Sequence, residues 1–106
     1  GCILLAWDEL VCAGCVGLRP LSETVCEMKR LYVKPDYLGT GLGRLLAEKI
    51  VQFGAEKKYS KILLDTLSSM NSAQALYRSL GFFETEPYYD NPHPDVVYFE
   101  KNMTNS

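Results

Sequence analysis

The stretch EMKRLYVKPDYLGTGLGR, residues 27–44, decides how this chain folds. Its first seven residues are rich in side chains that suit a pleated sheet, so they predict a strand. Pro35 and Asp36 then end that strand in a turn. Three alternating glycines, within residues 39–43, lead into a helix. A glycine loop at a helix start presents several backbone N–H groups at the positive end of the helix dipole, which is typical of a phosphate or pyrophosphate site.

Three strands are expected up to and including this stretch, over residues 3–7, 11–18 and 25–33. The connections between them are short, which indicates an antiparallel meander. Gly14 and Gly17 interrupt the second strand and suggest a β-bulge or a close backbone approach at that place.

The segment after the loop predicts a helix followed by a buried strand. From residue 42 the apolar side chains recur on one helical face, and the helix is expected to end before Tyr59. Residues 62–64 form a continuous apolar run, which is typical of a strand buried on both faces. A right-handed crossover would place this strand, residues 61–66, parallel to residues 25–33. The apolar positions of the helix are Leu42, Leu45, Leu46, Ile50 and Phe53.

The last third of the chain predicts a second helix and two more strands. Residues 68–71 offer several helix N-caps, and Gly81 is a C-cap glycine. A strand is expected from residue 82 to about residue 88, and a final strand over residues 96–99. The predicted fold class is α+β, a sandwich-like, mixed and mostly antiparallel sheet with one parallel pair and two helices. The inner stripe of the second helix consists of Ala73, Leu76, Tyr77 and Leu80.

The composition bounds the classes of function. The chain has 106 residues, of which 47% are hydrophobic and 23% charged, so one domain over residues 1–106 is expected. The net charge is −2 and no run of Lys or Arg occurs, which argues against nucleic-acid binding. No apolar run approaches the roughly 20 residues that span a bilayer, so no membrane partner is expected.

Four cysteines occur, of which Cys12 and Cys15 have the spacing of a redox or zinc motif. In a strand, a separation of three places the two side chains on opposite faces. Both are therefore interpreted as plain thiols, and no metal site is expected. Nothing indicates a disulfide framework, so a reducing cytoplasm is the expected compartment.

Two nucleotide-binding motifs compete for the glycine loop. A P-loop needs Gly-Lys-Ser/Thr, which the loop does not contain. A dinucleotide fingerprint needs a third glycine where this chain has Arg44, although Asp65 lies at a tolerable distance for its acidic residue. The meander before the loop is also the wrong context for a doubly wound sheet, so a dinucleotide-binding protein is only a weaker alternative.

Glu27 and Tyr77 are ambiguous from their pattern alone. Glu27 is a carboxylate within an apolar strand, which either faces solvent or acts as a general base beside a cleft. Tyr77 lies on a helical stripe of the kind that usually packs in a core. A functional role for Tyr77 would require its hydroxyl to reach a cleft.

Three blocks of the sequence together resemble the GNAT superfamily of acyl-CoA-dependent N-acetyltransferases. Residues 27–33 resemble the family's fourth strand. Residues 38–44 resemble its (Gln/Arg)-x-x-Gly-x-(Gly/Ala) pyrophosphate loop, with Gly41 and Gly43 on the motif glycines. The block ALYRSLGF, residues 75–82, resembles the family's Leu-Tyr…Gly-Phe block. The order of the predicted elements also agrees over nearly the whole chain.

The resemblance implies that acetyl-CoA is the cosubstrate and that it lies in a V-shaped opening between strands 25–33 and 61–66. It implies direct transfer of the acetyl group to a primary amine of a small molecule or peptide. Glu27 would be the catalytic base and Tyr77 the catalytic acid. The implied contacts to coenzyme A are Leu31, Tyr32, Val33, Leu38, Gly39, Thr40, Gly41, Leu42, Gly43 and Arg44.

Two departures from the family pattern leave an alternative open. Leu38 stands at the Gln/Arg position, so one side-chain contact to the pyrophosphate is expected to be missing. The chain is also expected to lack the family's usual first strand and two helices, which favours a non-catalytic module that binds coenzyme A or a partner chain.

Self-association is a further expectation from the first strand. Ile3, Leu5 and Trp7 fall on one face of this strand, and it carries no Lys or Pro that would block edge pairing. The simplest arrangement is a two-fold dimer.

Overall fold

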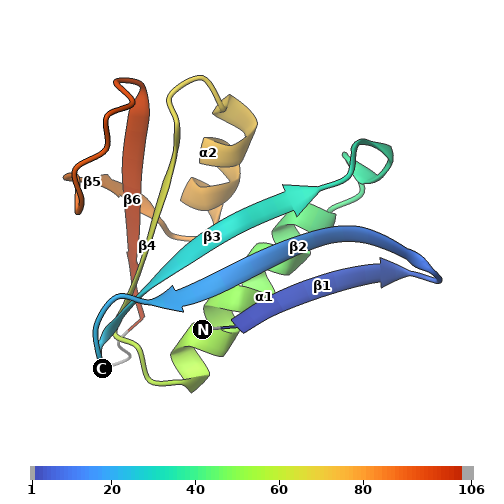
Figure 1. Cartoon of the computed structure of the whole chain (residues 1–106), viewed down its shortest axis with the longest axis horizontal. Helices are drawn as coiled ribbons and strands as arrows, with labels where there is room; N and C mark the ends of the chain where they lie inside the picture. The colour runs from blue at the N-terminus through green and yellow to red at the C-terminus, as the bar shows by residue number, and fades with distance from the viewer. Residues whose placement is uncertain (1, 104–106) are drawn as a thin grey trace.

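One mixed sheet organises residues 2–103, the part of the chain that the structure, a computed structural model, describes (Figure 1). Its strand order is β1-β2-β3-β4-β6-β5. Only β3 and β4 are parallel within this sheet, and the other neighbours are antiparallel. The predicted α+β class, the meander and the parallel crossover are therefore confirmed. The elements are β1 (Cys2–Asp8), β2 (Val11–Pro20), β3 (Val25–Val33), η1 (Pro35–Tyr37), α1 (Leu42–Glu56), β4 (Lys61–Leu67), α2 (Asn71–Ser79), β5 (Phe83–Thr85) and β6 (Val96–Asn102).

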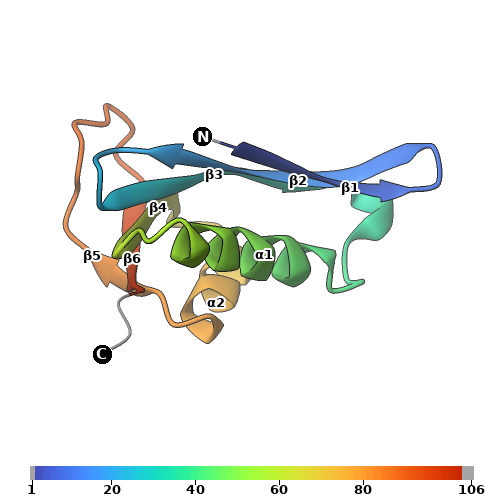
Figure 2. The ribbon, with the colours of Figure 1, turned by 90° about the horizontal axis from the view of Figure 1, so that it is seen from below.

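Both α-helices lie on the same side of the sheet (Figure 2). The core fills the space between them and the strands, and its centre is closed to solvent: Val16, Ile50 and Ile62 are each 0% exposed. Neither helix in residues 2–103 is long and apolar enough to cross a membrane. The opposite face of the sheet carries no helix in the described residues (Figure 2).

The buried stripe of α1 is narrower than the sequence predicts. Leu46 and Ile50 are buried, but Leu45 is 50% exposed. Successive helical residues are rotated by about 100°, so Leu45 lies at the flank of the stripe. It lines a shallow groove together with Ala6 and Trp7 instead of entering the core.

A bulge in β3 bends the strand next to its partner β2. Cys15 pairs with Tyr32 and Gly17 pairs with Lys29, so one residue of β2 opposes two residues of β3. Arg30, one of those two, has a φ of 58°, which is uncommon for a residue with a side chain. Such an extra residue bends a strand and re-aims its groups.

Gly14 explains the close approach that the sequence predicts for β2. A Cβ at this position would lie 2.6 Å from the backbone oxygen of Tyr32. Only glycine therefore allows β2 to pack this closely against the bulged end of β3. The bulge at Arg30 belongs to β3, but β2 carries one of its own against β1. Ala6 pairs with Gly14 and Trp7 with Cys12, so Ala13 is an extra residue and the bulge predicted beside Gly14 is confirmed.

Three boundaries in the last third differ from prediction. The N-cap of α2 is Met70, and no side chain caps the helix there. The Gln74 side chain donates hydrogen bonds to the backbone oxygens of Leu67 and Ser68, in the turn before the helix, at 3.0 and 3.1 Å. β5 ends at Thr85 rather than near residue 88, close to Pro87, which has no N–H for a ladder. β6 continues beyond residue 99 because its charged end still pairs with β4. Gly81 has a φ of 96°, as expected of a glycine after a helix.

Candidate active site

The parallel pair β3–β4 opens after three residues. Its ladder joins Val25 to Lys61, Cys26 to Ile62 and Glu27 to Leu63. Beyond Glu27 the two strands diverge, and Figure 1 shows the V-shaped gap between them. Half of the backbone N–H and C=O groups of a strand point toward each neighbouring strand. Beyond Glu27, the groups of β3 that point toward β4 therefore have no ladder partner within the described residues.

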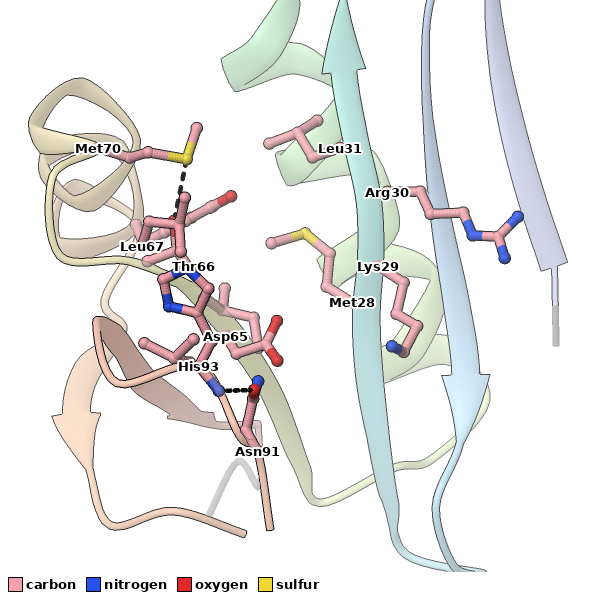
Figure 3. Close-up of a pocket in the computed structure, with 13 residues that line it drawn as sticks. Met28, Lys29, Arg30, Leu31, Asp65, Thr66, Leu67, Met70, Asn91 and His93 are labelled. Atoms are coloured by element: carbon pink, nitrogen blue, oxygen red, sulfur yellow. Dashed lines mark hydrogen bonds between the residues drawn. The ribbon is translucent and has the colours of Figure 1, made fainter. Parts of the chain in front are cut away.

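A cavity of about 450 Å³ occupies this gap. Met28 and Leu31 point into it from β3, whereas Arg30 points away from it (Figure 3). The wall formed by β4 consists of residues 64–67, and α2 and the loop before β6 complete the lining with Met70, Tyr77, Asn91, His93 and Val96. The structure thus places an opening where the sequence resemblance predicts one.

The glycine loop ends at the open N-terminus of α1. Gly39 and Gly41 have φ values of 79° and 87°, and Gly41 is the helix N-cap without any side-chain hydrogen bond. The first backbone hydrogen bond of the helix runs from the Leu45 N–H to the Gly41 oxygen. The N–H groups of residues 42–44 therefore have no backbone acceptor in the described chain, and the first turn carries no acidic side chain. Unpaired donors at the positive end of a helix are the usual setting of an anion site.

The side chains of this loop do not gather around the same point. Leu38 is 66% exposed. The Thr40 hydroxyl donates a hydrogen bond to the Tyr37 backbone oxygen at 2.5 Å. Arg44 donates one to the Ser79 hydroxyl at 2.5 Å and so ties α1 to α2. Any contact of this loop to a phosphate in this geometry would come from backbone N–H groups.

The three predicted contacts on β3 differ in their surroundings. The side chain of Leu31 lines the cavity. Tyr32 is 54% exposed. Val33 lies beside the start of α1. If Gly43 carried a Cβ, that atom would lie 3.7 Å from the Val33 Cγ2. The end of β3 is thus packed against the glycine loop, and Leu31 faces the gap.

Glu27 is 1% exposed, so the interpretation of Glu27 as a solvent-facing residue is wrong. Its Oε2 accepts a hydrogen bond from the Tyr88 hydroxyl at 2.5 Å. The Arg19 guanidinium nitrogen lies 2.8 Å from Oε1 and the Lys29 ammonium 3.6 Å from it. The Arg19 contact is an ion pair without hydrogen-bond geometry, because Oε1 has no hydrogen-bond partner. Glu27 lies at the base of the gap, but it does not line the cavity.

Tyr77 is 7% exposed and reaches the cavity from α2. Its ring packs against Phe82 and Phe99 with centroid separations of 6.0 and 6.2 Å. Burial, assisted by the charge of Asp65, raises the pKa of the Tyr77 hydroxyl above its usual value. The hydroxyl is therefore a protonated donor at neutral pH, and Tyr77 both packs in the core and lines the cavity.

Three residues of the site, all in the loop after β5, have no signal in the sequence that we recognised. Tyr89 donates a hydrogen bond to Asp65, and burial followed by this bond raises the pKa of Tyr89 to about 12. Asn91 in turn donates to the Tyr89 hydroxyl at 2.6 Å. Tyr88 contacts Glu27 from the same loop. The dipeptide Tyr88-Tyr89 was expected at the end of a strand and the start of a loop, and contacts this distant in sequence leave no periodic pattern.

The candidate acid and base lie on opposite faces of the sheet. Glu27 pairs with Leu63, so both side chains point to the same face, and Asp65 follows two residues later on that face. Tyr77 belongs to the helix layer on the other face (Figure 2). A reaction that passes a group through the gap could therefore use a base on one side and an acid on the other. No cluster of three or more metal-ligating side chains occurs in residues 2–103.

Comparison with known proteins bears on the family and the fold of this chain. Residues 1–82 match the model of the acetyltransferase (GNAT) family. A Schizosaccharomyces pombe protein named as an uncharacterized N-acetyltransferase is 47% identical over 106 residues, which are 98% of this chain and 65% of that protein. The chain therefore spans about two thirds of that relative's length.

Two solved structures share the fold. The ribosomal-protein-S18-alanine N-acetyltransferase of Escherichia coli superposes with a TM-score of 0.85 at 23% identity, over 99% of this chain and 70% of that one. A GNAT family acetyltransferase of Elizabethkingia anophelis, solved with acetyl-CoA bound, gives 0.83 at 23% identity, over 94% and 74%. These matches and the geometry of the gap lead to one conclusion, that the chain belongs to the GNAT family of acetyltransferases.

Proposed function

We propose that this chain transfers an acetyl group from acetyl-CoA to a primary amine by direct attack. The observation that carries the proposal is the continuity of the site. The cavity between β3 and β4 is lined by Leu31, and the end of β3 packs against the uncapped start of α1. One long ligand with a pyrophosphate at one end and a thioester at the other fits such a path.

The cosubstrate would be held mainly by backbone groups. The free N–H groups of Leu42, Gly43 and Arg44 would bind the pyrophosphate. The unpaired edge of β3 from Leu31 to Val33 would bind the pantetheine arm as an added strand does. This arrangement tolerates Leu38 at a position where the family motif has Gln or Arg, because the donors belong to the main chain.

The reaction needs a neutral amine and a protonated leaving group. An alkylammonium has a pKa near 10.4 and no free lone pair, so Glu27 would take one proton from the acceptor. The nitrogen then attacks the thioester carbon, and a backbone N–H of the β3 edge would stabilise the oxyanion. Tyr77 would give its proton to the departing thiolate and recover one from the new amide nitrogen. The net products are the acetylated amine, free coenzyme A and one proton.

The non-catalytic alternative makes a different prediction in one experiment. The protein is mixed with acetyl-CoA and a panel of amines, comprising a polyamine, an amino acid, an aminoglycoside and a peptide with a free N-terminus, and free thiol is followed. Acetyl transfer predicts thiol release that depends on one class of amine. Binding of acetyl-CoA by calorimetry without thiol release for any amine would support the binding module and contradict the proposal.

We further propose that the chain associates with itself through the face without helices. Ile3, Leu5 and Trp7 on β1 are 63%, 52% and 62% exposed, and β1 is an edge strand of the sheet. A row of exposed apolar side chains on an edge strand favours pairing with a second copy of the chain. Sedimentation equilibrium should show a dimer in the micromolar range, and a monomer throughout would refute this.

A reducing cytoplasm stays our proposal for the compartment and is supported by the four free thiols.

A further inference from the structure

Two opposite charges lie on the two sides of the narrow end of the opening. Glu27 pairs with Leu63 in the last step of the β3–β4 ladder. Side chains alternate along a strand, so Lys29 and Asp65, each two residues further on, project from the same face of the sheet. Both line the cavity, one from each strand (Figure 3). The narrow end of the cavity thus offers one ammonium and one carboxylate on this face.

The charge of Asp65 has no cation beside it. No ion pair joins Asp65 to Lys29, or to any other basic side chain in residues 2–103. Its carboxylate accepts a hydrogen bond from the Tyr89 hydroxyl. A neutral hydroxyl orients the carboxylate but does not cancel its charge, so the wall formed by β4 keeps one negative charge for a ligand.

The charge of Lys29 is only partly compensated. Its ammonium lies 3.6 Å from Glu27 Oε1, and the Arg19 guanidinium lies nearer to the same oxygen, at 2.8 Å. Glu27 carries one negative charge, so the three groups together keep one positive charge. Of the two cations only Lys29 lines the cavity, and 38% of its side chain is exposed. The wall formed by β3 therefore keeps one positive charge for a ligand.

The two charges lie where the proposed path of acetyl-CoA ends. The glycine loop adjoins Val33 at the wide end of the opening, and Leu31 lines the cavity between that end and Lys29. A pyrophosphate at the start of α1 would direct the pantetheine arm along residues 33–31 and bring the thioester toward the narrow end. An acceptor that attacks the thioester there must lie beside Lys29 and Asp65.

We propose that the acceptor is a free α-amino acid, bound through its ammonium by Asp65 and through its carboxylate by Lys29. The proposal names the substrate class of the acetyl transfer proposed above and rests on that function. Paired strands are about 4.8 Å apart, so charges just beyond the ladder suit a ligand whose own two charges are close together. A polyamine has no anion for Lys29. In a peptide the carboxylate next to the terminal ammonium is replaced by a neutral amide.

The first experiment compares amino acids with amines that lack the carboxylate. The chain is incubated with acetyl-CoA and a mixture of the amino acids found in proteins, and separately with the corresponding decarboxylated amines. Mass spectrometry identifies the products. Amino acids should be acetylated at the α-nitrogen at initial rates about 10- to 100-fold above those of the amines, because a hydrogen bond to a charged group is lost in the amines. Preference for a decarboxylated amine, a polyamine or a peptide would overturn the proposal while the acetyl transfer stands.

Lys29→Gln and Asp65→Asn test the two contacts separately. The substrates are the best amino acid of the mixture and its decarboxylated amine. Lys29→Gln should lower kcat/KM for the amino acid about 10- to 100-fold more than for the amine. Any effect through Glu27 acts on both substrates and cancels in this ratio. Asp65→Asn should lower both values by a similar factor, since both substrates carry the ammonium. Lys49→Gln is the control, because Lys49 is an exposed lysine of α1 outside the cavity. Equal losses for both substrates in Lys29→Gln would overturn the proposal.

Binding distinguishes a failure of this proposal from a failure of the acetyl transfer. The chain is saturated with coenzyme A, which has no acetyl group to transfer, and is titrated with the amino acid mixture while the amide signals of residues 29 and 65 are followed by NMR. Shifts in the native chain that Lys29→Gln abolishes, without thiol release for any amine, would contradict the acetyl transfer and leave the amino acid site standing. Absence of shifts in the native chain would overturn the site.

Discussion

The two ends of the β3–β4 pair differ in almost every respect although they belong to the same two strands. In the paired end, Cys26 and Ile62 are hydrogen-bonded neighbours and each is 0% exposed. In the open end the ladder is lost, and Leu67 is 36% exposed beside a cavity of about 450 Å³. The paired end fixes the geometry, and the open end uses that geometry to form a site.

Glu27 lies at the junction of the two ends. It is the last residue of β3 in the parallel ladder, and the bulge at Arg30 follows three residues later. The closed sheet therefore buries and orients the carboxylate, while the backbone just beyond it is free to bind a ligand. The bulge of β3 against β2 thus lies just beyond the point where β3 leaves its ladder with β4.

Glu27→Gln is expected to have the largest effect on the open end. The amide keeps the size of the side chain but cannot take a proton, so kcat at neutral pH should fall by about 10²- to 10⁴-fold. Much of the loss should be recovered as the pH approaches the amine pKa near 10.4, where the base is no longer needed. A pH–rate profile measures this. Two profiles that run parallel over the whole range would remove Glu27 as the base.

Ile62→Ala tests the paired end in the same way. Removal of a fully buried isoleucine should lower the free energy of unfolding by about 2–5 kcal/mol. Leu67→Ala, at the open end of the same strand, should cost well under half of that because the side chain is already 36% exposed. Urea denaturation of both variants gives the comparison. Equal losses of stability would show that the two ends are equally packed. They would contradict the view that only the paired end fixes the geometry.

Gly41→Val tests the anion site at the start of α1. No atom lies within 4 Å of a Cβ at Gly41, so there is space for a side chain. What disfavours a side chain at this position is the backbone φ of 87°. A side chain in this left-handed region costs about 1–2 kcal/mol, and a β-branched one more. Affinity for acetyl-CoA, measured by calorimetry, should therefore fall roughly tenfold or more. Unchanged affinity in Gly41→Val would refute the assignment.

Tyr77→Phe should change turnover without changing the fold. The ring contacts to Phe82 and Phe99 remain, so unfolding and acetyl-CoA affinity should change little. Loss of the acidic hydroxyl should lower kcat by about tenfold or more. Steady-state kinetics beside calorimetry separates the two quantities. Equal losses of turnover and affinity would make Tyr77 a packing residue only.

The sequence predicts the parts of the site that depend on local backbone preference. The strand at residues 25–33 agrees with β3 in both bounds. Gly39 and Gly41, before α1, adopt the positive φ that only glycine takes easily. The crossover from β3 to β4 follows from the handedness of such connections. Each of these features is decided by residues that are close together in the chain.

The features that the sequence does not predict depend on contacts between distant residues. Arg30 adopts a positive φ without being glycine, because the pairing of β2 with β3 imposes the bulge. Tyr88 meets Glu27 across a separation of 61 residues. In each case tertiary packing overrides the local preference.

The most direct test of the central claim, that the open end of β3–β4 and the glycine loop together hold acetyl-CoA, is an amide NMR titration of the chain with acetyl-CoA. The amide signals of residues 31–33 and 41–44 should shift together at one saturating concentration. Those of Cys26 and Ile62 in the paired end should stay in place. Shifts confined to other strands, or no shift at millimolar acetyl-CoA, would contradict the account.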